Sequence, residues 1–135
     1  MPILVDTGIL YALADADDIW HQRAREWVEA VSELLLVPVT VLPEITYLLH
    51  TRLGHVAERA FLKSVAAGEL EIDALRSRDI DRCCELMDRH PDLGFVDVSI
   101  VAVAERLKVT TLATTDRRHF GRVVPRHVRG FQLAP

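Results

Sequence analysis

Short apolar runs alternate along this chain with longer segments of helical periodicity, and this alternation most constrains the fold. The apolar runs at residues 2–5, 34–37, 70–75 and 111–114 have the length of strands. One or two segments with helical spacing separate each run from the next. Parallel strands need crossover connections of this kind. The alternation therefore predicts an α/β protein with a mainly parallel central β-sheet, flanked by helices on both faces.

The expected helices follow from apolar residues repeated at i, i+3 and i+4. They cover residues 7–13, 19–32, 40–53, 55–67, 77–87 and 96–107. Asp17 or Asp18, Thr40 and Ser77 are the expected N-caps of three of these helices. The tail, residues 123–133, is expected to add an edge strand. Core packing is the expected role of Trp20 and Trp27.

The length and composition of the chain set its organisation. With 135 residues, of which 50% are hydrophobic, we expect residues 1–135 to form one domain without a metal or disulfide support. Cys83 and Cys84 are adjacent within a helical pattern, so no disulfide framework is expected. The sequence has neither a long apolar run nor a signal-peptide pattern. We therefore expect a cytoplasmic protein with no membrane span.

The net charge of −4 at pH 7 argues against a protein that coats nucleic acid with a general basic surface. A metal-dependent nuclease remains compatible with this charge. Its acidic cluster makes the total charge negative, while local arginines still meet the substrate.

Four acids are expected at one edge of the sheet. Asp6 follows the first strand directly, and Asp116 follows the strand at residues 111–114. Glu44 lies in the first turns of the helix after the second strand, and Asp97 opens the helix before the last of these strands. In open α/β sheets, ligands bind at this carboxyl edge of the strands.

Each acid also has a structural explanation. Asp6, Asp97 and Asp116 have positions suited to helix caps, and Glu44 favours the positive end of its helix dipole. Capping does not explain why acids from remote segments share one edge. Carboxylates held close together need a cation or a shared proton. A set of oxygen ligands favours Mg²⁺ or Mn²⁺, and the histidines lack the spacing of a zinc site.

Other polar residues near these acids have two possible roles, ligand contact or local hydrogen bonding. The hydroxyls of Thr7 and Thr115 and the side chain of Arg117 would contact a ligand water or a phosphate, but local turn hydrogen bonds are the favoured role. Asp92 lies in the loop before Asp97, which could bring it near the site. There it is expected at most to support the four acids, without binding a ligand itself.

Four motifs in order resemble a known family: ILVDTGILYAL, TVLPEITYLL, DLGFVDVSIVAVAERL and TLATTDRRHF. Together, over essentially the whole chain, they resemble a PIN domain, and among PIN domains a VapC-type toxin of a toxin–antitoxin pair. The resemblance implies a Mg²⁺-dependent endoribonuclease acting on RNA, a homodimer, and a small VapB-like antitoxin partner that blocks the site.

The family's acidic quartet falls on Asp6, Glu44, Asp97 and Asp116. The resemblance implies that Asp6, Asp97 and Asp116 bind the metal, and that Glu44 is either a ligand or the group that orients a water. Some relatives carry a further acid near the last one, whereas in this chain Thr114 and Thr115 precede Asp116. The number of metals therefore stays open.

Three other functions remain as alternatives. A non-toxin PIN-like nuclease in RNA processing would use the same acids. A small-molecule phosphohydrolase with an aspartyl nucleophile would need a second Asp two residues after the first, where this chain has Gly8. A non-catalytic binding module would keep the acid cluster for structural reasons.

Overall fold

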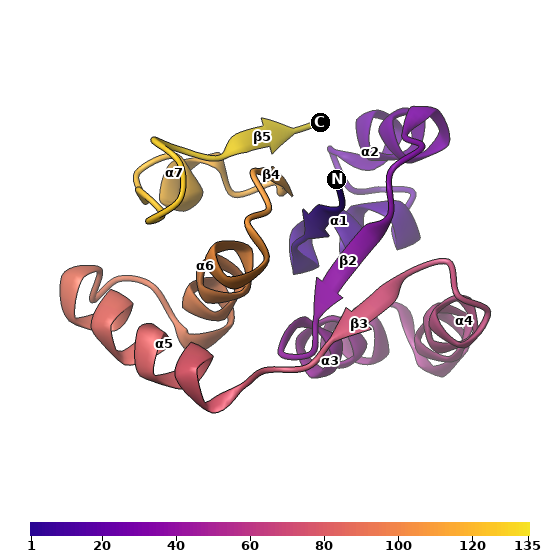
Figure 1. Cartoon of the computed structure of the whole chain (residues 1–135). Coiled ribbons are helices and arrows are strands. Elements are labelled where there is room, and N and C mark those ends of the chain that lie inside the picture. The colour runs from indigo at the N-terminus through magenta and orange to yellow at the C-terminus, as the bar shows by residue number, and fades with distance from the viewer.

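Five parallel strands form one sheet in the computed structural model, which describes residues 1–135 (Figure 1). The strand order is β3-β2-β1-β4-β5, and every neighbouring pair is parallel. The strands are β1 (Ile3–Val5), β2 (Leu35–Pro38), β3 (Glu71–Asp73), β4 (Thr111–Ala113) and β5 (Gln132–Ala134). The predicted α/β class and the edge strand in the tail are confirmed.

Seven helices connect the strands. They are α1 (Thr7–Ala14), α2 (His21–Ala30), α3 (Val41–Leu53), α4 (His55–Ala66), α5 (Ser77–Arg89), α6 (Phe95–Leu107) and α7 (Arg117–Phe120). The chain runs outward from β1 to β3 and then returns past β1 to β4, so right-handed crossovers place the two sets of helices on opposite faces. In Figure 1, α5 and α6 lie on one side of the sheet, and α1, α2 and α4 lie on the other.

The sheet and α6 form the centre of the core. All three residues of β1 are buried, and Leu4 pairs with Leu36 on one side and Leu112 on the other. Helix α6 is buried continuously over Val98–Glu105. This helix ends at Lys108, which adopts a left-handed conformation. A helix buried on nearly all sides has few alternative placements, and this fixes the position of Asp97 in its first turn.

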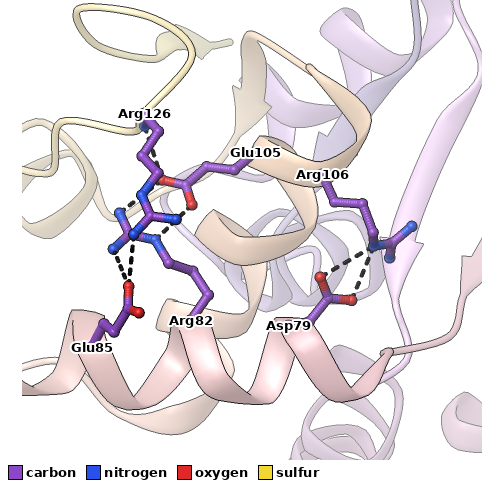
Figure 2. A network of polar contacts seen from close by, with 6 residues as sticks. All are labelled: Asp79, Arg82, Glu85, Glu105, Arg106 and Arg126. Carbon is purple, nitrogen blue, oxygen red and sulfur yellow. Dashed lines mark hydrogen bonds and ion pairs between the residues drawn. The ribbon is translucent and has the colours of Figure 1, made fainter.

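A network of ion pairs joins α5 to α6 and to the tail (Figure 2). Arg82 donates two hydrogen bonds to Glu105, at 2.7 and 3.0 Å, and both side chains are less than one-tenth exposed. The main-chain N–H of Arg126 also donates to Glu105. Asp79 accepts from Arg106 at 3.0 and 3.1 Å. Asp79 also lies at the N-terminus of α5, where it accepts from the Arg76 N–H at 2.9 Å.

Two of the three expected caps are wrong, and the third, Thr40, occupies the N-cap position of α3 without a side-chain capping bond. Helix α2 begins at His21 without a side-chain cap, although Asp18 accepts from the Trp20 N–H just before it. The Thr40 hydroxyl instead pairs with Ser99 on α6 at 2.6 Å. Ser77 is the first helical residue of α5 and not its cap. The Asp18 carboxylate and the Thr40 hydroxyl thus bind other partners than the helix N–H groups that the local pattern assigned to them.

None of the helices has both the length and the apolar character needed to cross a membrane. Cys83 and Cys84 are free, the first buried and the second exposed. The absence of a disulfide agrees with the expectation from their spacing.

Candidate acidic site at the carboxyl edge of the sheet

An open cleft of about 460 Å³ lies where β1 and β4 end. All four acids singled out in the sequence line it: Asp6, Glu44, Asp97 and Asp116. They come from the end of β1, from α3, from α6 and from the loop after β4. Parallel topology brings these remote segments to one edge. The structure therefore places the four side chains around one cleft, while their chemical roles remain a prediction.

Asp6 is the most buried of these acids, with 6% of its surface exposed. Its Oδ1 accepts from the Thr7 N–H at 2.7 Å, and its Oδ2 accepts from the Thr114 hydroxyl at 3.0 Å. Burial raises the pKa of Asp6 to about 7; the two hydrogen bonds oppose this rise, and the charges of Asp97 and Glu44 add to it. Asp6 therefore caps α1 and is also held in the cleft, so the two interpretations are compatible.

Glu44 reaches the cleft from the exposed first turn of α3. The Thr7 hydroxyl donates to its Oε1 at 2.5 Å. Thr7 therefore connects two of the acids, since its N–H binds Asp6 and its hydroxyl binds Glu44. This hydroxyl has a partner on another element, not a local turn bond.

Asp97 is half-buried in the first turn of α6, and its helix is capped by Gly94 and not by Asp97 itself. Burial raises the pKa of Asp97, and the charges of Asp116 and Glu44 raise it further, while His119 opposes the rise. A carboxylate with three acidic neighbours and no direct cationic partner is under electrostatic stress.

Asp116 caps the short helix α7, where its Oδ1 accepts from the His119 N–H at 3.1 Å. Its Oδ2 lies 2.7 Å from Nδ1 of the same histidine. The hydrogen bond to Asp116, with its charge, raises the pKa of His119. The Nε2 of His119 lies 3.6 Å from a carboxylate oxygen of Asp92. Asp92 therefore approaches the site only through this imidazole.

The cleft depends on a close approach between α1 and the loop after β4. A Cβ atom added to Gly8 would lie 2.2 Å from Oγ1 of Thr115. No residue but glycine fits at this position without moving Thr115. Both residues line the cleft.

The side chains that line the cleft are chemically suited to bind a hard divalent cation. They supply carboxylate oxygens without a thiol, and the pKa values of Asp6 and Asp97 are raised by burial and by the negative charges crowded around them. No three acidic, histidine or cysteine side chains of the chain already converge closely enough to hold a metal ion between them. Repulsion and the hydrogen bonds from Thr7, Thr114 and His119 hold the carboxylates apart. A cation would offset that repulsion after small side-chain movements.

Sequence reasoning missed three residues of this site. Thr114 is fully buried and bridges Asp6 to the Asp116 N–H. His119 was considered only for metal-ligand spacing, although its position three residues after Asp116 on a helical turn places it beside that acid. Arg52 lines the cleft and lies over the Tyr11 ring at 5.1 Å. No sequence signal links Arg52 to the site.

The two tryptophans differ from each other in a way the sequence did not indicate. Both pack partly on the core, as expected. Trp20 also lines the acidic cleft, and Trp27 lines a separate apolar groove between α1, α2 and α4.

The chain is thus a small parallel α/β domain whose carboxyl edge carries carboxylates from four segments. The PIN domain family model matches residues 3–124, and the chain belongs to this family. The chain is 31% identical over 125 residues to Ribonuclease VapC26 of Mycobacterium tuberculosis, covering 91% of this chain and 93% of that protein.

Solved structures are similar over nearly the whole chain. VapC20 of Mycobacterium tuberculosis, described as a sarcin–ricin loop cleaving toxin, has a TM-score of 0.79 at 25% identity, covering 94% of this chain and 98% of that one. VapBC2 of Rickettsia felis, bound to a DNA fragment from its promoter, has a TM-score of 0.72 at 16% identity and covers all of both chains. The resemblance to a VapC-type PIN domain, expected from the sequence motifs, is confirmed.

Proposed function

We propose that this chain is a metal-dependent endoribonuclease and the toxin of a VapBC-type toxin–antitoxin pair, with residues 1–135 as its ribonuclease domain. One observation carries the proposal: four carboxylates from four separate segments line one cleft at the carboxyl edge of the sheet. Capping accounts for Asp6 and Asp116 individually, but it does not account for Glu44 and Asp97 facing the same space.

The acids have distinct roles in this proposal. Asp6, Asp97 and Asp116 would hold Mg²⁺ or Mn²⁺, and Glu44 would either join them or orient the attacking water. When bound, the cation polarises the scissile phosphate and lowers the pKa of a bound water. Thr7 fixes Glu44 through its hydroxyl, and His119 fixes Asp116 through Nδ1.

The substrate class follows from the relatives. VapC26 is named a ribonuclease, and VapC20 is described as a toxin that cleaves the sarcin–ricin loop, which supports RNA as the substrate here. Such an enzyme would act in the cytoplasm, where its RNA is found. The open shape of the cleft also suits a polymer better than an enclosed small molecule.

A small VapB-like antitoxin is the proposed partner. The apolar groove between α1, α2 and α4 has a volume of about 410 Å³ and would take an apolar segment of such a partner. It is lined by Ile9, Leu13, Trp27, Val28 and Phe61 among others. Helix α2 borders the groove through Trp27 and Val28, whereas no residue of α3 lines it.

The homodimer stays part of the proposal. Several large apolar side chains of α3 and α4 are exposed: Tyr47, Leu53, Val56 and Leu62. A second copy of the chain would bury such residues. Sedimentation of the purified chain with and without its antitoxin tests this part separately.

The decisive experiment measures RNA cleavage by the purified chain with Mg²⁺, with Mn²⁺ and with excess chelator. We expect cleavage only with a divalent ion, and none from Asp97→Asn in the same buffers. Cleavage that continues in chelator would overturn the metal mechanism. A chain that binds its antitoxin but cuts no RNA would favour the non-catalytic binding module.

A further inference from the structure

Two arginines from different helices lie over one tryptophan at the edge of the acidic cleft. The guanidinium carbon of Arg23, on α2, lies 4.9 Å from the centre of the Trp20 ring. That of Arg117, on α7, lies 5.6 Å from the same ring. Trp20 itself lines the cleft together with Asp116 and Glu44. The two guanidinium groups are therefore held next to the acids by contacts to an aromatic face.

The donors of these two arginines also converge on a single oxygen atom. The Nη2 of Arg23 donates to the main-chain oxygen of Pro135 at 3.0 Å, and the Nη2 of Arg117 donates to that same oxygen. Figure 1 shows the C-terminal end of the chain beside α2. Two guanidinium groups that share one oxygen acceptor have the arrangement that binds a phosphate oxygen.

No side-chain carboxylate pairs with Arg23 or Arg117, whose shared acceptor is the Pro135 oxygen. Arg25, Arg82, Arg106 and Arg126 each form an ion pair with a carboxylate. Neither Arg23 nor Arg117 forms one, and both are exposed. Two exposed guanidinium groups without a side-chain carboxylate partner lie beside four carboxylates, where a polyanion must approach.

RNA entering this cleft meets repulsion from the acids unless positive groups offset it. A cation at the carboxylates neutralises the scissile phosphate, but the neighbouring phosphates need other partners. Nucleic-acid grooves combine aromatic platforms with basic side chains for this purpose. Trp20, Arg23 and Arg117 supply that combination at the edge of the cleft.

We propose that Trp20, Arg23 and Arg117 form a subsite that binds a backbone phosphate of single-stranded RNA next to the scissile bond. This inference rests on the proposed ribonuclease function and names the residues that bind its substrate. The phosphate oxygen takes the place that the Pro135 oxygen occupies between the two guanidinium groups. Trp20 acts as a positioning residue that holds both arginines at the edge of the cleft.

A purely structural role gives different expectations. If the arginines serve only to hold the tail against α2 and α7, their removal would lower the melting temperature and leave substrate affinity unchanged. A phosphate contact made equally in the ground and transition states instead raises KM and leaves kcat unchanged when it is removed. Its removal also weakens the salt dependence of binding, by about one in the slope for each phosphate that the protein no longer neutralises.

The test compares the double variant Arg23→Gln/Arg117→Gln with the control Arg25→Gln/Arg118→Gln. The control removes two charges from the same two helices, at exposed positions that contact neither Trp20 nor the Pro135 oxygen. A labelled single-stranded RNA of mixed sequence is cleaved with Mg²⁺ at several salt concentrations. We expect KM to rise at least about tenfold for the first variant, with kcat within about twofold and a weaker salt dependence. Trp20→Leu should give a smaller rise in KM.

Melting curves of every variant accompany the kinetics. KM values and salt slopes equal to those of the control, with or without a lower melting temperature, would overturn the subsite and leave the ribonuclease function standing. A parent protein that cuts no RNA with any divalent ion would overturn the proposed function and the subsite with it.

Discussion

The Thr114 hydroxyl donates to the Asp6 carboxylate at 3.0 Å, across two neighbouring strand ends. The same hydroxyl accepts from the main-chain N–H of Asp116 at 2.9 Å. The side chain is fully buried, so neither group has water as an alternative partner. One hydroxyl therefore connects the first and the last acid of the cleft.

Thr114→Val should lower both stability and cleavage. Valine has nearly the same shape but leaves the Asp116 N–H without an acceptor, which costs about 1–3 kcal/mol of unfolding free energy. Asp6 also loses a donor that favours its charged form. Thr114→Ser, which keeps the hydroxyl, is the control and should retain most of both properties. Chemical denaturation and RNA cleavage measure the two effects; equal behaviour of the valine and serine variants would show that the hydroxyl is dispensable.

The stability of the metal-free chain should fall as pH rises from about 4 to 7. Asp6 has a pKa of about 7 in the folded state and an ordinary value of 3.8 when unfolded, so the folded state binds more protons in this range. The contribution of protonated Asp6 to the free energy of unfolding is fully present below pH 3.8 and is lost as the pH rises to about 7. The loss amounts to about 4 kcal/mol, from a pKa rise of about three units at about 1.4 kcal/mol each.

Asp6→Asn should remove this pH dependence and make the metal-free chain more stable than the parent at pH 8, while abolishing cleavage. Melting temperatures without metal between pH 5 and pH 8 measure the effect. Asp81→Asn, on the exposed face of α5, is the control for removal of a charge. A parental pH slope in the Asp6 variant would mean that this carboxylate is ionised throughout.

His119→Ala should reduce cleavage more than it reduces stability. The imidazole holds one oxygen of Asp116 through Nδ1 at 2.7 Å, and without it that carboxylate is free to turn away from the cleft. We expect a loss in kcat of about tenfold to a hundredfold, as for partners that orient metal ligands. A raised Mg²⁺ requirement should accompany the loss. His55→Ala, at an exposed position on α4, should behave like the parent, and so would His119→Ala if the imidazole had no part in the site.

Most of the fold could be predicted from the sequence because the signals were local and repeated. Apolar strand runs and helical spacing identified every strand, and the parallel topology then placed Asp6 and Asp116 at the same edge. The errors concern caps. Thr40 and Ser77 had the right residue type for capping, but only the folded chain shows that Ser99 lies within hydrogen-bond distance of the Thr40 hydroxyl.

The parts of the cleft that the sequence did not predict depend on contacts between distant segments. Arg52 comes from the end of α3, and its position over Tyr11 follows from the packing of α3 on α1. Arg23 and Arg117 are separated by most of the chain and meet only because α2 and α7 both lie beside Trp20. Hydrophobic periodicity and motif spacing do not predict such tertiary contacts between distant segments.

Gly8→Ala should impair cleavage strongly although the change is a single methyl group. The new Cβ would lie 2.2 Å from Oγ1 of Thr115, so the Thr115 side chain must move, and we expect the loop that carries Asp116 to shift with it. A displacement of this size at a catalytic loop lowers kcat by about a hundredfold. Gly130→Ala is the control, since a Cβ at that position has no neighbour within 4 Å. Equal cleavage by the two variants would mean that the loop adapts without moving its acid.

Glu105→Gln should destabilise the chain far more than Glu85→Gln, although both acids pair with Arg82 (Figure 2). Glu105 has 9% of its side chain exposed and Glu85 has 52%. Burial raises the pKa of Glu105, but hydrogen bonds from Arg82 and from the Arg126 N–H outweigh this and hold it below its ordinary range. The glutamine therefore leaves the buried Arg82 charge with Glu85, an exposed carboxylate, as its only acidic partner.

Removal of one partner from a buried ion pair costs about 3–5 kcal/mol, whereas an exposed pair contributes about 1 kcal/mol or less. For a chain of this length, we expect the melting temperature of Glu105→Gln to fall by about 10 °C or more, and that of Glu85→Gln by about 3 °C at most. Glu105 lies eight residues after Asp97 on α6, about 12 Å along the helix axis. Cleavage at a temperature where both variants are folded should therefore match the parent. A large loss of cleavage without loss of stability would instead make this network part of the catalytic site, because only a shift of α6 at Asp97 would connect the two.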